Sequence, residues 1–150
     1  MLDVRVGNGV DVHAFTEGNE INLCGLKIPF SKKLLGHSDA DVGLHAITDA
    51  LYGAIASGDI GTHFPPSDKT WKNVASEVFL KHAVHLVEEF GFKINNIDCT
   101  IICEQPKIGP LSNKMKSSVS KIMDLDINRI SLKATTSEKL GPKFKKKVSN

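Results

Sequence analysis

Asp11 and His13 stand two residues apart in a stretch, Val4 to Val12, where valines alternate with other residues around Gly7 and Gly9. This alternation is typical of a strand, with glycines allowing a bulge or a close backbone approach. Residues two apart on a strand point to the same side. The pattern therefore predicts that one carboxylate and one imidazole project to the same side, where they could provide two ligands of a metal site.

A third candidate ligand falls on a predicted helix. Asp41, His45 and Asp49 recur at i, i+4 and i+8 and form a polar stripe on an otherwise apolar cylinder. Burying such a stripe is unfavourable unless something satisfies it, and a divalent metal bound by His45 and the Asp-x-His pair would do so. Two imidazoles and one carboxylate with an open fourth position are typical of catalytic zinc. Asp49, one turn further on, is placed to orient the His45 imidazole as a hydrogen-bond acceptor.

The same histidines allow a plainer interpretation. An Asp-x-His pair alone is more often a hydrogen-bonded or surface pair than a metal site. His37 precedes the helix and fits an ordinary loop histidine, and His63 carries no pattern of its own. His82 and His85 are most simply the polar face of an amphipathic helix.

Two further segments have the character of phosphate sites. His37 and Ser38 lie beside a predicted helix N-terminus, where free N–H groups and the helix dipole favour anions. The run from Lys133 to Lys139 gathers hydroxyls, two lysines and Glu138, a carboxylate that could hold Mg²⁺ between phosphates. The alternative is a threonine-rich strand followed by a solvated turn.

The elements that must position these residues alternate along the chain. We expect strands and a hairpin at Val4–Val12, Ile21–Ile28, Ile94–Cys103 and Ile130–Thr136, and helices opening at Ser38 through a capping box and spanning Asn73–Phe90 and Leu111–Leu125. Residues 58 to 72 are expected to form a loop. The order predicts an α+β fold, a two-layer α/β sandwich in which one sheet packs against helices, with residues 1–150 as a single domain.

Composition excludes several classes. The chain has 150 residues, 41% hydrophobic, with a net charge of only +2, so nothing indicates a nucleic-acid partner. No apolar run is long enough to cross a membrane, and no secretory signal is visible. Three cysteines without CxxC spacing indicate reduced thiols, with Cys99 and Cys103 as packing residues. We therefore expect a cytoplasmic protein.

In combination the motifs resemble the 2-C-methyl-D-erythritol 2,4-cyclodiphosphate synthase family. The matching stretches run in family order up to Gly141: Gly9 to His13; His37 to Val42 with His45 and Asp49; Gly58 to Gly61 with Phe64 and Pro65; Pro106 and Lys107; and Ala134 to Gly141. Together they are far more specific than any one of them.

The resemblance implies a cyclising, CMP-releasing phosphorus–oxygen lyase of the non-mevalonate (MEP) isoprenoid pathway. In 4-diphosphocytidyl-2-C-methyl-D-erythritol 2-phosphate, the 2-phosphate would attack the β-phosphorus and CMP would leave. It further implies one Zn²⁺ per site, a second cation, Mg²⁺ or Mn²⁺, with the substrate phosphates, and a homotrimer with sites between subunits. The attack is intramolecular, so the protein's task is positioning and offsetting charge.

The resemblance also assigns roles to residues. Zn²⁺ would be held by Asp11, His13 and His45, and the second cation by Glu138. The transition state would be steadied by His37 and Thr136. Substrate-binding residues would be Ser38, Asp59, Ile60, Gly61, Phe64, Asp68, Cys103, Pro106, Lys107, Ala134, Thr135 and Lys145.

The end of the chain departs from the family. Family members continue past the Lys-Leu-Gly segment into a glycine-rich turn with an arginine and then a last apolar strand. Here Pro142 to Lys147 replaces that turn, with Lys145 about where the arginine would be, although lysine offers a point charge and no planar fork. We expect either a truncated product with a basic tail over 142–150 or a differently built trimer core.

Two other functions stay open at the level of the sequence. One is a metallohydrolase of phosphoesters that uses the same three ligands to activate water. The other is a non-enzymatic paralogue or a binding partner of an intact synthase.

Overall fold

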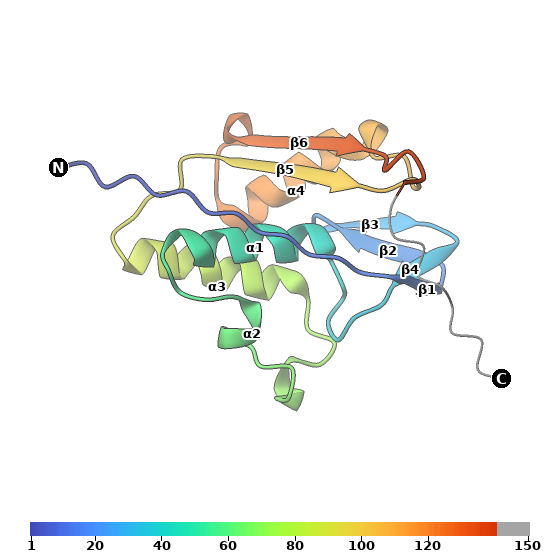
Figure 1. Cartoon of the computed structure of the whole chain (residues 1–150), viewed down its shortest axis with the longest axis horizontal. Coiled ribbons are helices and arrows are strands. Elements are labelled where there is room, and N and C mark those ends of the chain that lie inside the picture. The colour runs from blue at the N-terminus through green and yellow to red at the C-terminus, as the bar shows by residue number, and fades with distance from the viewer. Residues whose placement is uncertain (141–150) are drawn as a thin grey trace.

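The computed structural model describes residues 1–140, so Lys145 and the expected basic tail 142–150 lie outside the described residues. Four α-helices and six strands follow one another along this part of the chain (Figure 1). Their bounds are β1 (Phe15–Glu17), β2 (Glu20–Leu23), β3 (Leu26–Pro29), β4 (Lys32–Leu34), α1 (Val42–Ala54), α2 (Ile60–His63), α3 (Ser76–Glu89), β5 (Ile97–Ile102), α4 (Ser112–Met123) and β6 (Ile130–Thr135). Across residues 1–140 we find no helix with the length and apolar character that crossing a membrane requires.

The strands form small sheets over the helices. β5 and β6 pair in parallel through the α4 crossover, while β1 pairs with β4 and β2 with β3 antiparallel. The expected mixed α/β class is confirmed, but the expected single sheet is wrong for the described residues, which form three two-stranded sheets. Figure 1 shows β5 and β6 on one side of the α1 and α3 pair.

The core lies between these layers. β5 alternates strictly, with Ile97, Cys99 and Ile101 buried and the residues between them exposed. Inward side chains of α1, α3 and α4 complete the cluster, including Leu44 and Leu80. Such alternation is what a strand with one covered face requires. As predicted, Cys99 packs in the core, and Cys103 lies half-buried beside it.

The predicted strand over Val4 to Val12 is wrong as a strand. This segment runs extended beside α1, and none of residues 4–12 pairs with another strand in the part of the chain that the structure describes (Figure 1). The alternation itself persists: the four valines are 72–90% exposed, and the residues between Val6 and His13 alternate outward and inward. A Cβ on Gly7 or Gly9 would stand 1.8 or 1.9 Å from a carbonyl oxygen of α1. The glycines therefore allow the extended segment to lie directly against the backbone of α1.

Of two local predictions, the hairpin is confirmed and the helix cap is wrong. The hairpin is confirmed, and its turn uses Cys24 and Gly25 at φ of 50° and 76°, the mirror-image turn that suits a hairpin's twist. The helix cap at Ser38 is wrong, because α1 starts later and Asp41 is its N-cap, accepting from Leu44 N at 3.0 Å. The carboxylate of Asp41 also accepts from the backbone of the hairpin turn, so it joins the hairpin to the helix.

The other boundaries shift by a few residues. α3, β5, α4 and β6 all lie inside their predicted ranges. Residues 58 to 72, expected to be a loop, contain the short helix α2 and a 3₁₀ turn at Lys69–Trp71. Both begin with an aspartate, Asp59 and Asp68, whose side chain accepts from the backbone of the first turn.

Candidate metal centre

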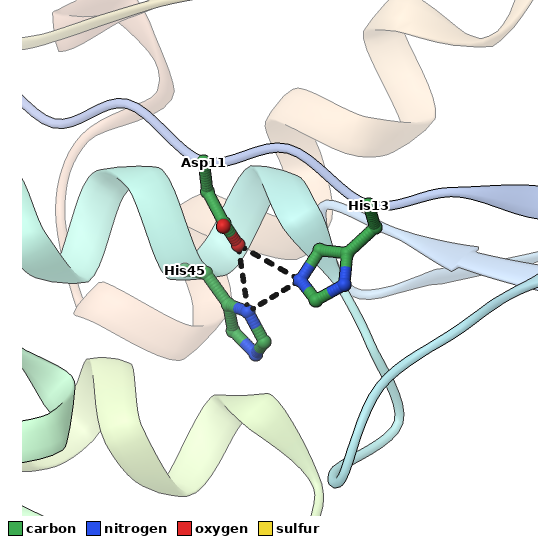
Figure 2. A group of neighbouring side chains, drawn as sticks. All are labelled: Asp11, His13 and His45. Carbon is green, nitrogen blue, oxygen red and sulfur yellow. Dashed lines mark hydrogen bonds and ion pairs between the residues drawn. The ribbon is translucent and has the colours of Figure 1, made fainter. Parts of the chain in front are cut away.

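Asp11, His13 and His45 converge on one point. Asp11 Oδ2 lies 2.9 Å from both His13 Nε2 and His45 Nδ1, and the two nitrogens are 3.2 Å apart (Figure 2). One ligand atom from each residue lies within 4.8 Å of the other two. The segment before β1 supplies two of these side chains and α1 the third, so the contact at Gly7 and Gly9 helps to hold the ligands in place.

The proton positions favour a cation at this point. His13 Nδ1 is 2.7 Å from the carbonyl oxygen of Leu35, which can only accept, so Nδ1 carries the hydrogen of a neutral ring. Nε2 then turns a lone pair toward the carboxylate of Asp11. Lone pairs facing one another at this distance repel unless a proton or a metal lies between them. Zn²⁺, bound at about 2.0–2.1 Å by nitrogen and oxygen ligands, fits these residues.

The cluster is partly buried but open on one side. Side-chain exposure is 26% for Asp11, 16% for His13 and 12% for His45. Burial raises the pKa of Asp11, but the close imidazoles of His45 and His13 and the N–H of Val12 outweigh it and lower that pKa below its ordinary value. The carboxylate is thus ready to bind a cation near neutral pH.

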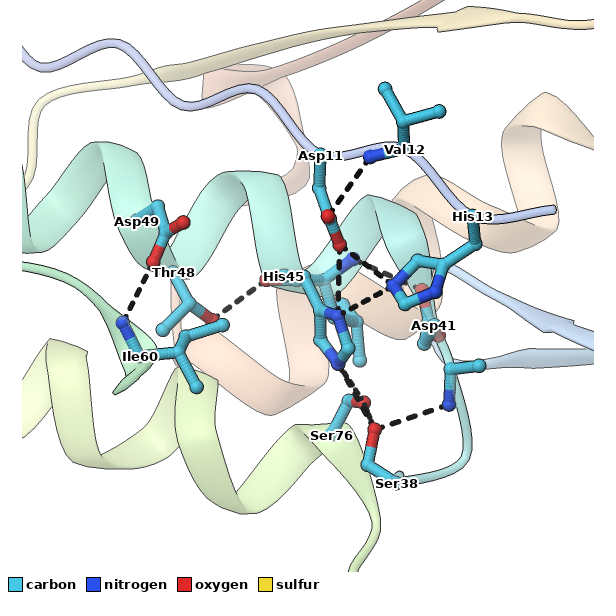
Figure 3. Close-up of polar contacts among 12 residues, drawn as sticks. Asp11, Val12, His13, Ser38, Asp41, His45, Thr48, Asp49, Ile60 and Ser76 are labelled. Atoms are coloured by element: carbon cyan, nitrogen blue, oxygen red, sulfur yellow. Dashed lines mark hydrogen bonds and ion pairs between the residues drawn. The ribbon is translucent and has the colours of Figure 1, made fainter. Parts of the chain in front are cut away.

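The far nitrogen of His45 enters a second group of polar side chains. His45 Nε2 lies 2.8 Å from Ser76 Oγ and 3.2 Å from Ser38 Oγ (Figure 3). Ser76 contacts the carboxylate of Asp39. The sequence analysis missed Ser76 and Asp39, because no spacing rule joins residues 37 positions apart.

Asp49 does not orient His45 as expected. Among residues 1–140 its carboxylate accepts from Ile60 N at 2.9 Å and has no hydrogen bond to the imidazole (Figure 3). Burial, together with the charges of Asp59 and Asp11, raises the pKa of Asp49. Asp49 therefore ties α1 to the first residue of α2.

The predicted substrate loop is organised by α2. The Asp59 side chain accepts from Thr62 N and Oγ1 at 2.9 Å, which lowers its pKa. Gly61 is exposed at the surface, whereas Phe64 is buried against Trp71 and Phe79. Phe64 therefore packs among aromatic rings in the described chain, and its contact with substrate stays a prediction.

His37 and Ser38 lie beside the metal cluster. The His37 ring is exposed, while its carbonyl accepts from Asn73 N at 2.8 Å. Ser38 accepts from Ala40 N at 3.1 Å and reaches His45 with the same oxygen. The loop therefore joins the backbone before α1 to the imidazole of His45, and the anion site at His37 and Ser38 stays a prediction.

The C-terminal candidates form a second group. Cys103 N donates to Thr135 O at 3.1 Å, which brings the segment after β5 against the end of β6. Ala134, Thr135 and Lys107 are exposed, and Pro106 is half-buried. A cavity of about 480 Å³ is lined both by Asp11 and His13 and by this segment through Cys103 and Pro106. Within one chain, two of the three cluster residues and the predicted cytidine segment line the same cavity.

Glu138 stands apart from the three converging ligand atoms of the described chain. It is exposed, its φ is +53°, and its Oε1 accepts from Thr136 Oγ1 at 3.3 Å. The loop is held by Glu104, a residue that the sequence analysis missed. The Glu104 carboxylate accepts from Ser137 N, Ser137 Oγ and Lys139 N at 2.7–3.2 Å, which lowers its pKa.

The remaining histidines lie elsewhere. His63 stacks on Tyr52 at 4.3 Å between ring centroids, and His82 Nδ1 lies 2.6 Å from the Tyr52 hydroxyl. Only His85 belongs to an exposed helix face, where it pairs with Glu89.

Comparison with known proteins places this geometry in a family context. The sequence model of the YgbB family matches residues 4–149. A 2-C-methyl-D-erythritol 2,4-cyclodiphosphate synthase of Roseobacter denitrificans is 60% identical over 140 residues, which are 93% of this chain and 88% of that protein. A bifunctional enzyme IspD/IspF of Ruegeria pomeroyi is also 60% identical over 140 residues, but the chain spans only 37% of its length.

The fold agrees with these similarities. A solved 2C-methyl-D-erythritol-2,4-cyclodiphosphate synthase in its CDP-bound form superposes with a TM-score of 0.86 at 43% identity, covering 92% of each chain.

Proposed function

The chain belongs to the YgbB family, and from that membership together with the Asp11, His13 and His45 cluster we propose that it is a 2-C-methyl-D-erythritol 2,4-cyclodiphosphate synthase. The reaction class is a cyclising phosphorus–oxygen lyase of the non-mevalonate pathway. The observation that carries the proposal is the convergence of three ligand atoms at one partly buried point.

The reaction joins two ends of one substrate. In 4-diphosphocytidyl-2-C-methyl-D-erythritol 2-phosphate, an oxygen of the 2-phosphate bonds to the β-phosphorus, the bond from that phosphorus to the α-phosphate bridging oxygen breaks, and CMP leaves with that oxygen. No protein nucleophile is needed. The protein must instead fold the substrate into an attack geometry and offset its negative charge.

The ligand set supplies part of that charge compensation. Asp11, His13 and His45 would hold Zn²⁺, which when bound withdraws charge from a phosphate oxygen as a Lewis acid. Glu138 is the proposed ligand of Mg²⁺ or Mn²⁺ at the substrate phosphates. Because Glu138 lies outside the cluster, the two cations are proposed to occupy separate positions.

Side chains of the loops complete the site. His37, which is exposed, and Thr136 are proposed to steady the charge that develops in the transition state. Ser38 and the α2 residues Asp59, Ile60 and Gly61 would bind the methylerythritol part, with Asp68 beside them. Ala134, Thr135, Cys103, Pro106 and Lys107 would bind cytidine, and the contact between Cys103 and Thr135 supports that grouping.

Assembly into a homotrimer is part of the proposal. Val4, Val6, Val10 and Val12 leave a row of apolar side chains 72–90% exposed along the N-terminal segment. Contiguous exposed apolar surface on a small protein favours a protein interface. A site between subunits would then combine the metal cluster of one chain with nucleotide residues of the next. A cytoplasmic location is also proposed, since all three thiols are free in the described chain.

Incubation of the purified protein with the diphosphocytidyl substrate tests the proposal. The expected products are the eight-membered cyclic diphosphate and CMP in equal amounts, identified by ³¹P NMR. A linear bisphosphate would instead identify a metallohydrolase, and an unchanged substrate with zinc-loaded protein would rule out both enzymes. His45→Ala should remove zinc and turnover together, because two ligands remain of three.

A further inference from the structure

We infer that Ser76 and Asp39 are positioning residues for the metal ligand His45, which they hold through a hydrogen-bonded chain from carboxylate to hydroxyl to imidazole. The inference rests on the proposed function for the metal but concerns side chains to which that function assigns no role.

The chain begins at the carboxylate of Asp39. Asp39 Oδ2 accepts from Ser76 N at 3.0 Å, and Asp39 Oδ1 contacts the Ser76 hydroxyl. An ionised carboxylate only accepts, so the single hydroxyl hydrogen of Ser76 points toward Asp39. Ser76 is fully buried, so water does not compete for this hydrogen.

The direction of the next hydrogen bond follows. With its hydrogen committed, Ser76 Oγ turns a lone pair toward His45 Nε2 at 2.8 Å, and Nε2 must therefore donate. A neutral imidazole has one N–H, so Nδ1 of His45 is left with its lone pair. That is the atom that lies 2.9 Å from Asp11 Oδ2 in the metal cluster.

This arrangement resembles a carboxylate–histidine–metal relay with a hydroxyl inserted. A carboxylate that accepts the far N–H of a metal-bound histidine fixes the tautomer and orientation of the ring and raises its basicity. Ser38 Oγ is the weaker partner because it lies 3.2 Å from His45 Nε2, further away than Ser76 Oγ at 2.8 Å.

The same two residues also hold the start of α3. Ser76 is the first residue of that helix, and its N-cap Ala75 makes no side-chain cap. Asp39 takes over this function by accepting from Ser76 N, and Asp39 N donates to Val74 O. The chain therefore connects α3 and the loop of His37 and Ser38 to the metal ligand on α1.

The test compares metal affinity and the His45 ring proton in matched serine variants. Zinc affinity is measured by chelator competition on the full chain, and the His45 Nε2–H resonance is followed by NMR in the zinc-loaded protein. Ser76→Ala should weaken zinc binding about 10- to 100-fold and remove the slowly exchanging ring proton. The control is Ser120→Ala on α4, which removes the hydrogen bond from Ser120 Oγ to Leu125 O. Zinc affinity and the ring-proton resonance should both stay unchanged in this variant.

Conservative variants separate positioning from folding. Ser76→Thr keeps the hydroxyl and should restore most of the affinity. Asp39→Asn keeps the shape and an acceptor but removes the charge, so it should weaken zinc binding less than Ser76→Ala while the fold persists. If Ser76→Ala does not fold, the zinc affinity of Asp39→Asn decides the inference.

Unchanged zinc affinity in both Ser76→Ala and Asp39→Asn overturns the inference, and so does a wild-type chain that binds no zinc. A wild-type chain that binds zinc but forms no cyclic product would refute the proposed function, while the affinity comparison would still decide this inference.

Discussion

At the scale of single residues, the two histidines of the cluster use their nitrogens in opposite order. His13 directs Nε2 into the cluster and donates from Nδ1 to Leu35 O, whereas His45 directs Nδ1 inward and places Nε2 against Ser76. His13 lies on the extended N-terminal segment, whereas His45 lies on α1. Each ring is therefore held by a contact at its far nitrogen, and losing either contact should loosen the metal.

Glu138 should act on the second cation alone. Because it lies outside the converging ligand atoms, Glu138→Gln removes a charge without disturbing zinc. We expect unchanged zinc content and at least a tenfold higher Mg²⁺ concentration for half-maximal turnover, equivalent to about 1.4 kcal/mol. Metal analysis and an Mg²⁺ titration of turnover check this. Zinc loss in the variant, or an unaltered Mg²⁺ titration, would refute the separate assignment.

His82 should make stability depend on pH. Burial, followed by the charges of His63 and His85, lowers its pKa below 6.5, although the charge of Glu89 acts in the opposite direction. The unfolded chain then binds more protons than the folded chain as pH falls from about 6.5, so stability rises with pH in that window. Protonation also removes the acceptor of the Tyr52 hydroxyl at His82 Nδ1.

Replacing His82 by Asn should reduce this pH dependence. Urea unfolding at several pH values between 5 and 7.5 measures it. Wild type should lose more stability on acidification than His82→Asn, while His85→Asn, which alters an exposed ring on the same helix, should follow wild type more closely. Equal slopes for wild type and His82→Asn would contradict the assignment.

At the scale of elements, the N-terminal segment and α1 form one unit that assembles the cluster. Two ligands come from the segment and one from the helix, so their distance depends on how closely the two backbones approach. Gly9 sets that approach, because a Cβ there would stand 1.9 Å from Ala46 O. Because backbone atoms form both sides of this contact, no flexible side chain could move aside to make room for the Cβ.

Gly9→Ala should therefore weaken metal binding without unfolding the domain. The segment must shift away from α1, which carries Asp11 and His13 with it. We expect zinc affinity to fall at least tenfold, about 1.4 kcal/mol, while the thermal unfolding of the metal-free protein changes little. Gly109→Ala, at a position with open space around it, is the control. Wild-type affinity in Gly9→Ala would show that the segment tolerates the displacement.

The two-residue spacing correctly predicted that Asp11 and His13 project together, because that part of the ligand geometry is local. The two-residue spacing of Asp11 and His13 keeps both on one side of any extended backbone, whether or not a ladder forms. The ladder itself depends on a partner strand, which periodicity cannot specify, and so the strand was predicted where only an extended segment exists. The start of α1 was misplaced because Ser38 and Asp41 both suit a cap, and only tertiary contacts with the hairpin turn select Asp41.

The residues that the sequence missed act over long separations. Ser76 lies 31 positions from His45 and Glu104 lies 33 from Ser137, and no helical or strand spacing connects them. Asp49 was assigned to the imidazole by its i+4 position, but the fold brings Ile60 N closer to its carboxylate. Local sequence patterns identify candidate metal ligands, whereas the residues that hold those ligands in place are brought to them by tertiary packing.

At the scale of the whole molecule, the exposed valine row is the feature least suited to a monomer. Val4 and Val6 are 72% and 90% exposed, on an extended segment whose opposite side faces α1. Burial of such side chains contributes about 1.5–3 kcal/mol each. The surface is thus better explained by contact with further copies of the chain, in line with a site completed between subunits.

The assembly can be tested by placing charge in the valine row. The wild-type chain should have the solution mass of three copies, by light scattering. Val4→Lys with Val6→Lys should give a folded monomer, because unpaired ammonium groups in an apolar interface cost several kcal/mol. Val78→Lys, a comparable change at a partly exposed position on α3, should stay trimeric. The ligands Asp11 and His13 lie further along the segment, so the monomer should retain zinc yet lose turnover if partner residues complete the site. A trimeric double variant would place the interface elsewhere, and an active monomer would show that one chain holds the whole site.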